Sequence, residues 1–251
     1  MHKHAQDSNA MGIHAEPHYF PSPSLADAEG ILCIGGDLSV ERLLDAYCHG
    51  IFPWPIGVED MDEELLVWWS PNPRAIVDWG SFQIPRRLER KIRNSDWTIT
   101  SDKNFMEVIH GCATENQRKG NTWINKEISN AYYALHIAGY AHSVEVFAGE
   151  DLIGGIYGVA IGGMFAAESM FYRKPAASKI ALTVLLAHLR SRGFTLFDIQ
   201  QMTPHMESHG AIHVTRNEFL QRLHDAISAS VDFGNLDRKL SASSEWIRSN
   251  I

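Results

Sequence analysis

Three polar side chains stand in two otherwise mainly apolar stretches of the sequence. Glu168 lies in GMFAAESMFY, and Asp198 and Gln200 close the stretch FTLFDIQ. Alternation along a strand puts Asp198 and Gln200 on one face. The same alternation puts Glu168 on one face with Met164, Ala166, Met170 and Tyr172. Polar groups at the carboxyl end of a strand mark the place where α/β folds keep their binding crevices. We therefore predict that the three side chains converge on one cleft.

The sequence contains no obvious covalent nucleophile. Ser24, Ser70 and Ser178 lie in no nucleophile elbow, and no cysteine is paired with a histidine by its spacing. A glutamine has no atom that is easily protonated at neutral pH, so Gln200 can accept a hydrogen bond but cannot act as a strong base.

No metal ion and no cofactor are expected. His205 and His209 have the i, i+4 spacing of helical metal ligands, but Pro204 and Gly210 bracket a span that is too short for a stable helix. The sequence has no HExxH motif. The glycines of GGIYG do not form the GxGxxG fingerprint of a dinucleotide site and do not open a helix.

A strand, a buried helix and a second strand must position the three polar residues. Apolar residues surround most of segment 177–192, which is typical of a helix buried against a sheet, and Gly193 is placed to end it. From Trp97 onward the pattern predicts the order β-α-α-β-β-β-α-β-β-α. The predicted fold class is therefore α/β (α+β) with a mixed sheet.

Two further groups are candidates for binding a nucleic acid. Trp68 and Trp69 are adjacent in VWWSPNPR, so an extended chain turns one toward the core and one toward a cleft, unless both are packing residues. An accessible indole is a flat platform for a nucleobase. The net charge of −8 argues against broad affinity for nucleic acids, but a local basic face can still bind phosphate. The segment QIPRRLERKIR supplies such a cluster with Arg86, Arg90, Lys91 and Arg93.

Composition limits the class of protein. The 251 residues can form one large domain or two small ones. No window approaches 18 consecutive apolar residues, and the first 18 residues lack the apolar core of a signal peptide. The three cysteines have no CxxC spacing and fit reduced thiols. We expect a cytoplasmic globular protein, monomeric and without membrane contact, with a disordered tail over residues 1–18.

Longer motifs give the sequence a resemblance to a known family. The order of elements resembles the acyl-CoA N-acyltransferase (GNAT-like) fold, but the loop RKPAAS lacks the glycines with which that fold cradles a pyrophosphate. At finer grain the chain resembles the leucyl/phenylalanyl-tRNA–protein transferases. The motifs that carry this resemblance are GILCIGGDLSVERLLDAYCHGIFPWP, WWSPNPR, NTWI, HSVEVF, LIGGIYGVAIGGMFAAESMF, ASKIAL, FDIQ and SHGA. These motifs stand in the same order as in that family, and the resemblance spans roughly Phe20 to Leu223.

The resemblance implies a cofactor-free enzyme that transfers Leu, Phe or Met from aminoacyl-tRNA to an N-terminal Arg or Lys of a protein. The product would be marked for N-degron proteolysis. The tRNA would be bound by its 3′ end and acceptor stem. The resemblance also implies a small N-terminal domain over residues 19–80 and a GNAT-like catalytic domain over residues 81–232, with a C-terminal extension over residues 233–251.

The resemblance also assigns roles to residues. Glu168, Asp198 and Gln200 match the family's polar pocket. The terminal adenosine would be held by Trp123 together with Trp68 or Trp69. Ile156 and the neighbouring Phe165 would line the pocket for the transferred side chain. The family's basic patch maps onto Arg86, Arg90, Lys91 and Arg93 with a different spacing.

An aminoacyl ester is already activated, so the acceptor amine can attack it directly. Gln200 would accept a hydrogen bond from that amine, and Asp198 would orient Gln200 and favour the cationic intermediate. Glu168 would bind the amino group of the transferred residue or shape its pocket. Two alternative functions stay open, namely an N-acetyltransferase that uses coenzyme A and a non-catalytic module that binds RNA or protein N-termini.

Overall fold

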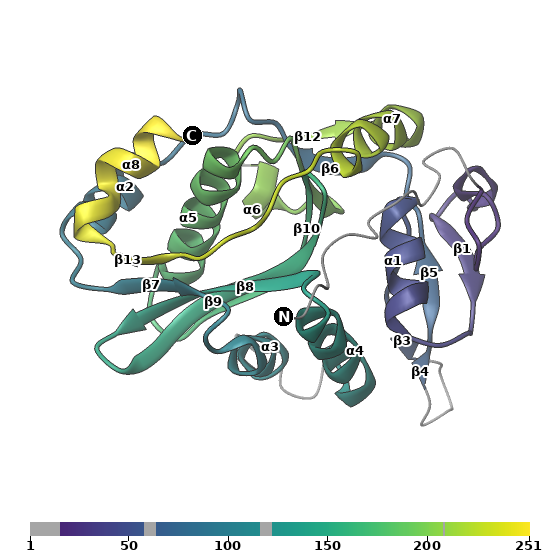
Figure 1. Ribbon diagram of the computed structural model, residues 1–251, viewed down its shortest axis with the longest axis horizontal. Helices are drawn as coiled ribbons and strands as arrows, with labels where there is room; N and C mark the ends of the chain where they lie inside the picture. Colours follow the sequence, from purple (N-terminus) through teal and green to yellow (C-terminus); the bar gives the residue numbers. More distant parts are fainter. Residues whose placement is uncertain (1–15, 58–63, 116–121, 208) are drawn as a thin grey trace, which may run out of the picture.

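The computed structural model describes residues 16–57, 64–115, 122–207 and 209–251. Its central feature is an eight-stranded mixed sheet in the order β12-β6-β11-β10-β9-β8-β7-β13 (Figure 1). In that order the strands are Ala211–Val214, Arg74–Val77, Leu196–Gln200, Met164–Tyr172, Asp151–Ile161, Ala141–Ala148, Thr98–Ser101 and Asp237–Lys239. Strands β10 and β11 are parallel, and the other neighbours are antiparallel.

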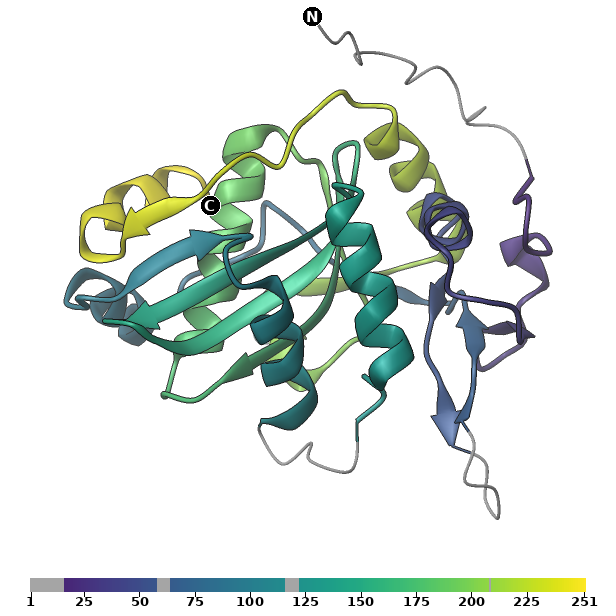
Figure 2. The same cartoon turned by 60° about the horizontal axis from the view of Figure 1, so that its bottom comes forward.

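Helices cover both faces of the large sheet (Figure 1, Figure 2). One face is covered by α5 (Ala177–Arg192), with α2 (Arg86–Arg93) and α8 (Ser244–Ser249) beside it, and the other by α3 (Phe105–Thr114) and α4 (Lys126–Ile137). Helix α5 buries nearly its whole length because it is apolar on most sides, and Gly193 ends it with a φ of 94°. Two further short helices, α6 (Pro204–Glu207) and η2 (Ser241–Ser243), lie in the C-terminal half of the chain.

The N-terminal part forms a three-stranded sheet in the order β1-β5-β2. Its elements are η1 (Pro23–Leu25), β1 (Ile31–Ile34), α1 (Val40–Cys48), β2 (Phe52–Pro53) and β5 (Val67–Trp69), with the pair β3 (Ile56–Gly57) and β4 (Glu64–Leu65) beside it. Helix α1 packs against α4 and against α7 (Arg216–Ile227), so this part is joined to the large sheet through apolar side chains.

The predicted mixed fold and the predicted order of elements are confirmed. The division into domains stays a prediction, but β6 precedes the predicted boundary at residue 80 and is a strand of the large sheet. Strand β13, from the predicted C-terminal extension, also belongs to this sheet. Most of the predicted tail, residues 1–15, lies outside the described residues. No described helix combines the length and the apolar character needed to cross a membrane.

A β-bulge in β10 corrects the predicted alternation. Ala167 pairs with Gly158 and Ser169 pairs with Tyr157, so Glu168 is an extra residue in this strand. Beyond the bulge the faces exchange. Phe171 joins Met164 and Ala166, whereas Met170 lies on the α5 side. The predicted shared face of Glu168 and Met170 is therefore wrong, because a bulge breaks the two-residue period.

The parallel pair β10–β11 separates at the level of this bulge. Its pairing ends at Ala166 and Asp198, although β10 continues to Tyr172 and β11 to Gln200. Strand β11 has an irregularity of its own between Asp198 and Gln200, where Gln200 adopts a left-handed φ of 63°. The two strands therefore diverge at the residues that carry the predicted polar groups.

Close packing around Gly158 supports the bulge and predicts a cost for any side chain there. A Cβ at this position would lie 2.2 Å from the carbonyl oxygen of Ala166 and 2.5 Å from the ring of Phe165. We expect Gly158→Ala to lower the free energy of unfolding by about 1–3 kcal/mol, measured by urea denaturation. Gly57→Ala is the control, because a Cβ added at Gly57 would meet no described neighbour within 4 Å. Equal stability of the two variants would contradict this packing.

Candidate active site

A cavity of about 250 Å³ opens where β10 and β11 diverge. Its polar lining residues are Glu168, Ser169, Gln200, Gln201 and Thr203, and the part around the hydrogen-bonded side chains of Glu168 and Gln200 is called its polar end. Its apolar wall is formed by Ile156, Met170, Leu182, Phe197, Ile199, Met202 and Met206, and Trp54 and Trp123 also line it. A larger cavity of about 580 Å³ between α4 and the N-terminal part contains none of the predicted site residues. The smaller cavity is therefore the candidate site.

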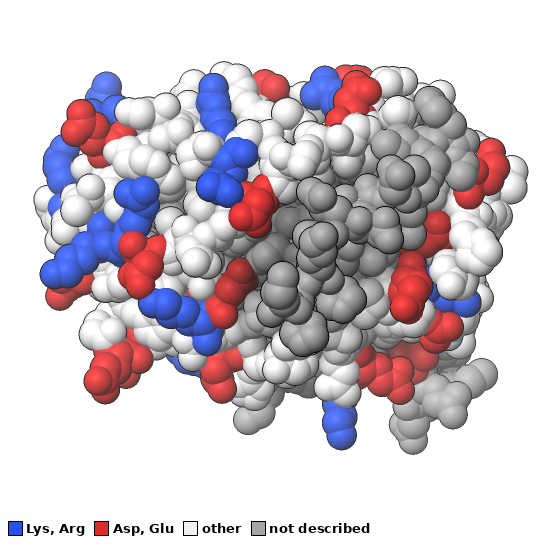
Figure 3. Space-filling view, in the orientation of Figure 1, with Lys and Arg blue, Asp and Glu red and all other residues white. Residues whose placement is uncertain are grey.

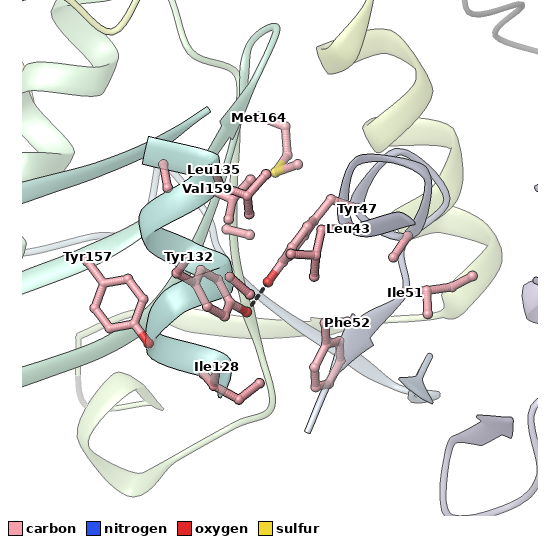
Figure 4. Packing of buried hydrophobic residues seen from close by; sticks show 14 of the residues in the cluster. Leu43, Tyr47, Ile51, Phe52, Ile128, Tyr132, Leu135, Tyr157, Val159 and Met164 are labelled. Carbon is pink, nitrogen blue, oxygen red and sulfur yellow. Dashed lines mark hydrogen bonds between the residues drawn. The ribbon is translucent and has the colours of Figure 1, made fainter. Parts of the chain in front are cut away.

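The carboxyl group of Glu168 receives three side-chain hydrogen bonds. The hydroxyl of Tyr47 donates to Oε1 at 2.7 Å, and the hydroxyl of Tyr132 donates to Oε2 at 2.9 Å. The amide of Gln200 donates to Oε1 at 2.9 Å. Figure 4 shows the phenols of Tyr47 on α1 and Tyr132 on α4 pointing toward one another. Their oxygens are 2.5 Å apart. Glu168 thus links the N-terminal part, α4 and β11.

This arrangement favours a protonated carboxyl group near neutral pH. Glu168, Tyr47 and Tyr132 make three oxygen–oxygen contacts, but the two phenols supply only two hydrogens. A protonated Glu168 supplies the third, in which case it donates to one phenol, and that phenol donates to the other phenol instead of to Glu168. Burial raises the pKa of Glu168 from its ordinary value of 4.5 to about 7, although the hydrogen bonds from both phenols oppose the shift. Burial also raises the pKa of both tyrosines well above their ordinary value, so they stay neutral hydrogen-bond donors.

Asp198 lies beside the cavity and does not line it. Arg74 binds both of its oxygens, with Nε at 2.9 Å from Oδ1 and Nη2 at 2.6 Å from Oδ2. The backbone N–H of Gln200 also donates to Oδ1, at 2.8 Å. Asp198 is thus placed to orient Gln200. Its charge is already paired, so the predicted stabilisation of a cationic intermediate by Asp198 has no support in this geometry.

The tryptophans at the cavity differ from the predicted set. Trp68 is fully buried against Phe20 and donates to the carbonyl of Gly35 at 2.8 Å, so the prediction that it could hold a nucleobase is wrong. Trp69 is half-buried and donates to the carbonyl of Trp54 at 3.2 Å. Trp54 itself stacks on the predicted Trp123, with ring centroids 5.1 Å apart. Trp54 and Trp123 are therefore the two indoles at the site.

Of the two residues predicted to line the side-chain pocket, only one lies at the cavity. Ile156 lines the cavity, as expected. Phe165 does not, because its ring stacks on Phe197 at 5.7 Å and on Phe233 at 6.0 Å on the side of the sheet that α5 covers. Phe197 occupies the wall position in its place. The assignment of Phe165 is wrong because its position precedes the bulge, where the cavity has not yet opened.

The basic cluster lies on α2, away from the cavity. Arg86, Arg90, Lys91 and Arg93 are all exposed, and the ammonium of Lys91 lies 4.3 Å from the ring centre of Trp97. In Figure 3 basic side chains, with some acidic ones among them, gather on the side of this face where Figure 1 places α2 and α8. Their role as phosphate contacts stays a prediction. Within the described ranges, no three or more His, Cys, Asp or Glu side chains are grouped to hold a metal ion.

The sequence analysis missed four residues that build the site, namely Tyr47, Trp54, Arg74 and Tyr132. Two of them carried a usable signal. Trp54 stands between two prolines in FPWP, which rigidifies the segment, and Arg74 opens the otherwise apolar strand RAIV. A buried strand that contains an arginine requires a buried acceptor, and Asp198 is that acceptor. The tyrosines carried no such signal, because tyrosines on helices are usually packing residues.

Comparison with known proteins gives consistent results. The family described as leucyl/phenylalanyl-tRNA protein transferase matches residues 76–224, and its N-terminal domain matches residues 36–72. The leucyl/phenylalanyl-tRNA–protein transferase of Shewanella baltica (strain OS155) is 47% identical over 215 residues, which cover 85% of this chain and 89% of that protein. The protein of the same name from Shewanella sp. (strain ANA-3) is 50% identical over 206 residues, which cover 81% and 85%.

One solved structure also aligns with the chain. It is L-PGS from Bacillus licheniformis, which is 15% identical and aligns over 85% of this chain and 70% of its own, with a TM-score of 0.35. A TM-score this low does not establish a common fold.

The raised pKa of Glu168 predicts a pH dependence of stability. Between pH 4.5 and about 7 the folded state holds a proton that the unfolded state has lost, so this contribution to stability falls as the pH rises through that window. The variant Glu168→Gln has no proton to lose at this position, so its stability does not fall for this reason. From pH 5 to pH 8 we expect the wild type to lose less than about 3 kcal/mol relative to the variant, because Glu168 is only partly buried and each pKa unit corresponds to about 1.4 kcal/mol.

The measurement is urea denaturation of both proteins at the two pH values. Glu127→Gln, at an exposed position on α4, serves as the control and should follow the wild type. Identical pH dependence in the wild type and Glu168→Gln would show that the carboxyl group titrates at its ordinary value.

Proposed function

The chain belongs to the leucyl/phenylalanyl-tRNA–protein transferase family, and we propose that it transfers Leu, Phe or Met from aminoacyl-tRNA to the α-amino group of an N-terminal Arg or Lys. Membership of the family makes it an aminoacyltransferase that acts between tRNA and protein. The observation that supports the finer proposal is the cavity itself, which combines one polar end with an apolar wall. An aminoacyl group has the same division into a polar and an apolar part.

The apolar wall would receive the transferred side chain. Three of its residues, Met170, Met202 and Met206, are methionines, whose flexible side chains adapt to ligands of different shape. Ile156, Leu182 and Phe197 would complete the contact. This composition supports a pocket that accepts both a branched and an aromatic side chain and gives a charged one no partner.

The terminal adenosine of the tRNA would stack on Trp54 and Trp123 at the edge of the cavity. Both indoles line the same cavity as Glu168, so a nucleoside there would hold its aminoacyl ester near the polar end. The indole N–H of Trp69 donates to the backbone carbonyl of Trp54, and this hydrogen bond would help to hold Trp54 in place. The acceptor stem would extend over the surface, where the basic residues of α2 are candidates for phosphate contacts.

The reaction we propose is direct aminolysis of the ester. The acceptor nitrogen forms a bond to the carbonyl carbon, the bond from that carbon to the ribose oxygen breaks, and this oxygen takes up the proton that the amine loses and becomes a hydroxyl group. Glu168 would bind the amino group of the transferred residue. The amide nitrogen of Gln200 already donates to Glu168, so its carbonyl oxygen is the atom that would accept a hydrogen bond from the attacking amine. Alignment of this kind can lower a barrier by about 7–11 kcal/mol.

The proposed product is a protein with a new N-terminal Leu, Phe or Met, which would mark it for N-degron proteolysis. We place this reaction in the cytoplasm, where aminoacyl-tRNA is made, and propose that a single chain suffices.

The first test is transfer of labelled leucine from Leu-tRNA to a peptide that begins with Arg. We expect a labelled product with this peptide and none with a matched peptide that begins with Ala, because only the first presents the proposed cationic residue. The product is measured by mass spectrometry. Transfer to both peptides would remove the proposed acceptor preference, and transfer to neither by a folded protein with intact Leu-tRNA would contradict the proposal as a whole.

The second test concerns the adenosine platform. Trp54→Ala should raise the KM for Leu-tRNA by about 5- to 150-fold, because stacking of a base on an aromatic ring contributes roughly 1–3 kcal/mol. Trp54→Phe should recover part of this loss. Trp246→Ala, on α8, is the control and should leave the KM unchanged. If Trp54→Ala bound Leu-tRNA as well as the wild type does, the platform would have to lie elsewhere.

A further inference from the structure

Arg74 is a fully buried cation that none of the steps above uses. It is 1% exposed and lies at the start of β6, beside the strand that carries Asp198 and Gln200. Its Nη1 donates to the carbonyl of Gly50 at 3.0 Å. The guanidinium lies between the rings of Phe52 and Phe219, at 4.8 and 4.5 Å from their centres. These contacts leave the group a single orientation.

Asp198 connects the guanidinium of Arg74 to the backbone of Gln200. The planar guanidinium binds both oxygens of Asp198, so the carboxylate is fixed in direction as well as in place. Oδ1 of Asp198 also accepts a hydrogen bond from the backbone N–H of Gln200 at 2.8 Å. Gln200 has a left-handed φ of 63°, which residues other than glycine rarely adopt without a specific partner. The hydrogen bond to Asp198 is such a partner.

We propose that Arg74 is a positioning residue for the transfer reaction and holds Gln200 in its left-handed conformation through Asp198. In this conformation the amide of Gln200 reaches Glu168 across the cavity. The inference rests on the proposed role of Gln200 in aligning the acceptor amine.

A buried ion pair could instead serve stability alone, and the two roles have different kinetic consequences. A positioning role acts on the chemical step, so kcat falls while the KM values change little. It also acts only through Gln200, so the loss disappears once the side chain of Gln200 is gone. A purely structural role lowers activity by the same factor whether Gln200 is present or not.

The experiment is a double-mutant cycle with Arg74→Lys and Gln200→Ala, measured as transfer of leucine from Leu-tRNA to the Arg peptide. Lysine keeps the charge but loses the two parallel hydrogen bonds. We expect Arg74→Lys to lower kcat about 100-fold in the wild type, the effect of a misplacement of about 1 Å, and less than about threefold in the Gln200→Ala background. Arg222→Lys, in the exposed pair with Glu218 on α7, is the control and should keep wild-type kcat.

Equal losses in both backgrounds, or an unchanged kcat for Arg74→Lys, would overturn the inference. A wild-type rate for Gln200→Ala would instead refute the proposed role of Gln200 itself. If Arg74→Lys does not fold, Asp198→Asn takes its place in the cycle. Its remaining oxygen can still accept from Nε of Arg74 and from the N–H of Gln200, but the amide nitrogen in place of Oδ2 cannot accept from Nη2, so the two parallel hydrogen bonds that fix the carboxylate are reduced to one. The same pattern of losses is therefore expected, and the same additivity would overturn the inference.

Discussion

The separation of β10 and β11 beyond Ala166 and Asp198 is the constraint on which the site depends. Two paired strands leave no room between them for a ligand. Here a bulge at Glu168 and an irregularity before Gln200 lie at the same level, and both turn polar side chains into the space that the strands leave. Where the two strands no longer pair, side chains can take the place of the backbone hydrogen-bond partners. The backbone N–H of Gln200, for example, donates to the carboxylate of Asp198.

The two strands carry one carboxyl group each at this opening, Glu168 on β10 and Asp198 on β11, and the two groups have different partners. Asp198 is paired with the buried guanidinium of Arg74, which is itself hydrogen-bonded to the carbonyl of Gly50. Glu168 has only neutral hydrogen-bond donors around it, and burial raises its pKa to about 7. One carboxyl group is therefore held in an ion pair, whereas burial raises the pKa of the other toward neutrality.

The N-terminal part supplies several of these partners. Tyr47 reaches Glu168, Gly50 and Phe52 hold Arg74, and Trp54 stacks on Trp123 from the large domain. These contacts come from α1 and the short segment that follows it. The polar end of the cavity is therefore complete only when both parts of the chain are packed together, which gives a physical reason for the small domain beside a mixed sheet that carries the other site residues.

The sequence by itself determined the mixed α/β class, the order of elements, and Glu168, Asp198 and Gln200 as neighbours, because these follow from hydrophobic periodicity and from polar groups in apolar strands. It also determined the family, through motifs in the right order. It did not determine the tryptophan pair, the tyrosines or the partner of Asp198. Those depend on contacts such as Tyr47 with Tyr132, 85 residues apart, and on a bulge that reverses the faces of a strand without a mark in its pattern. Only the tertiary structure decides them, because they arise where separate elements pack and not within any one of them.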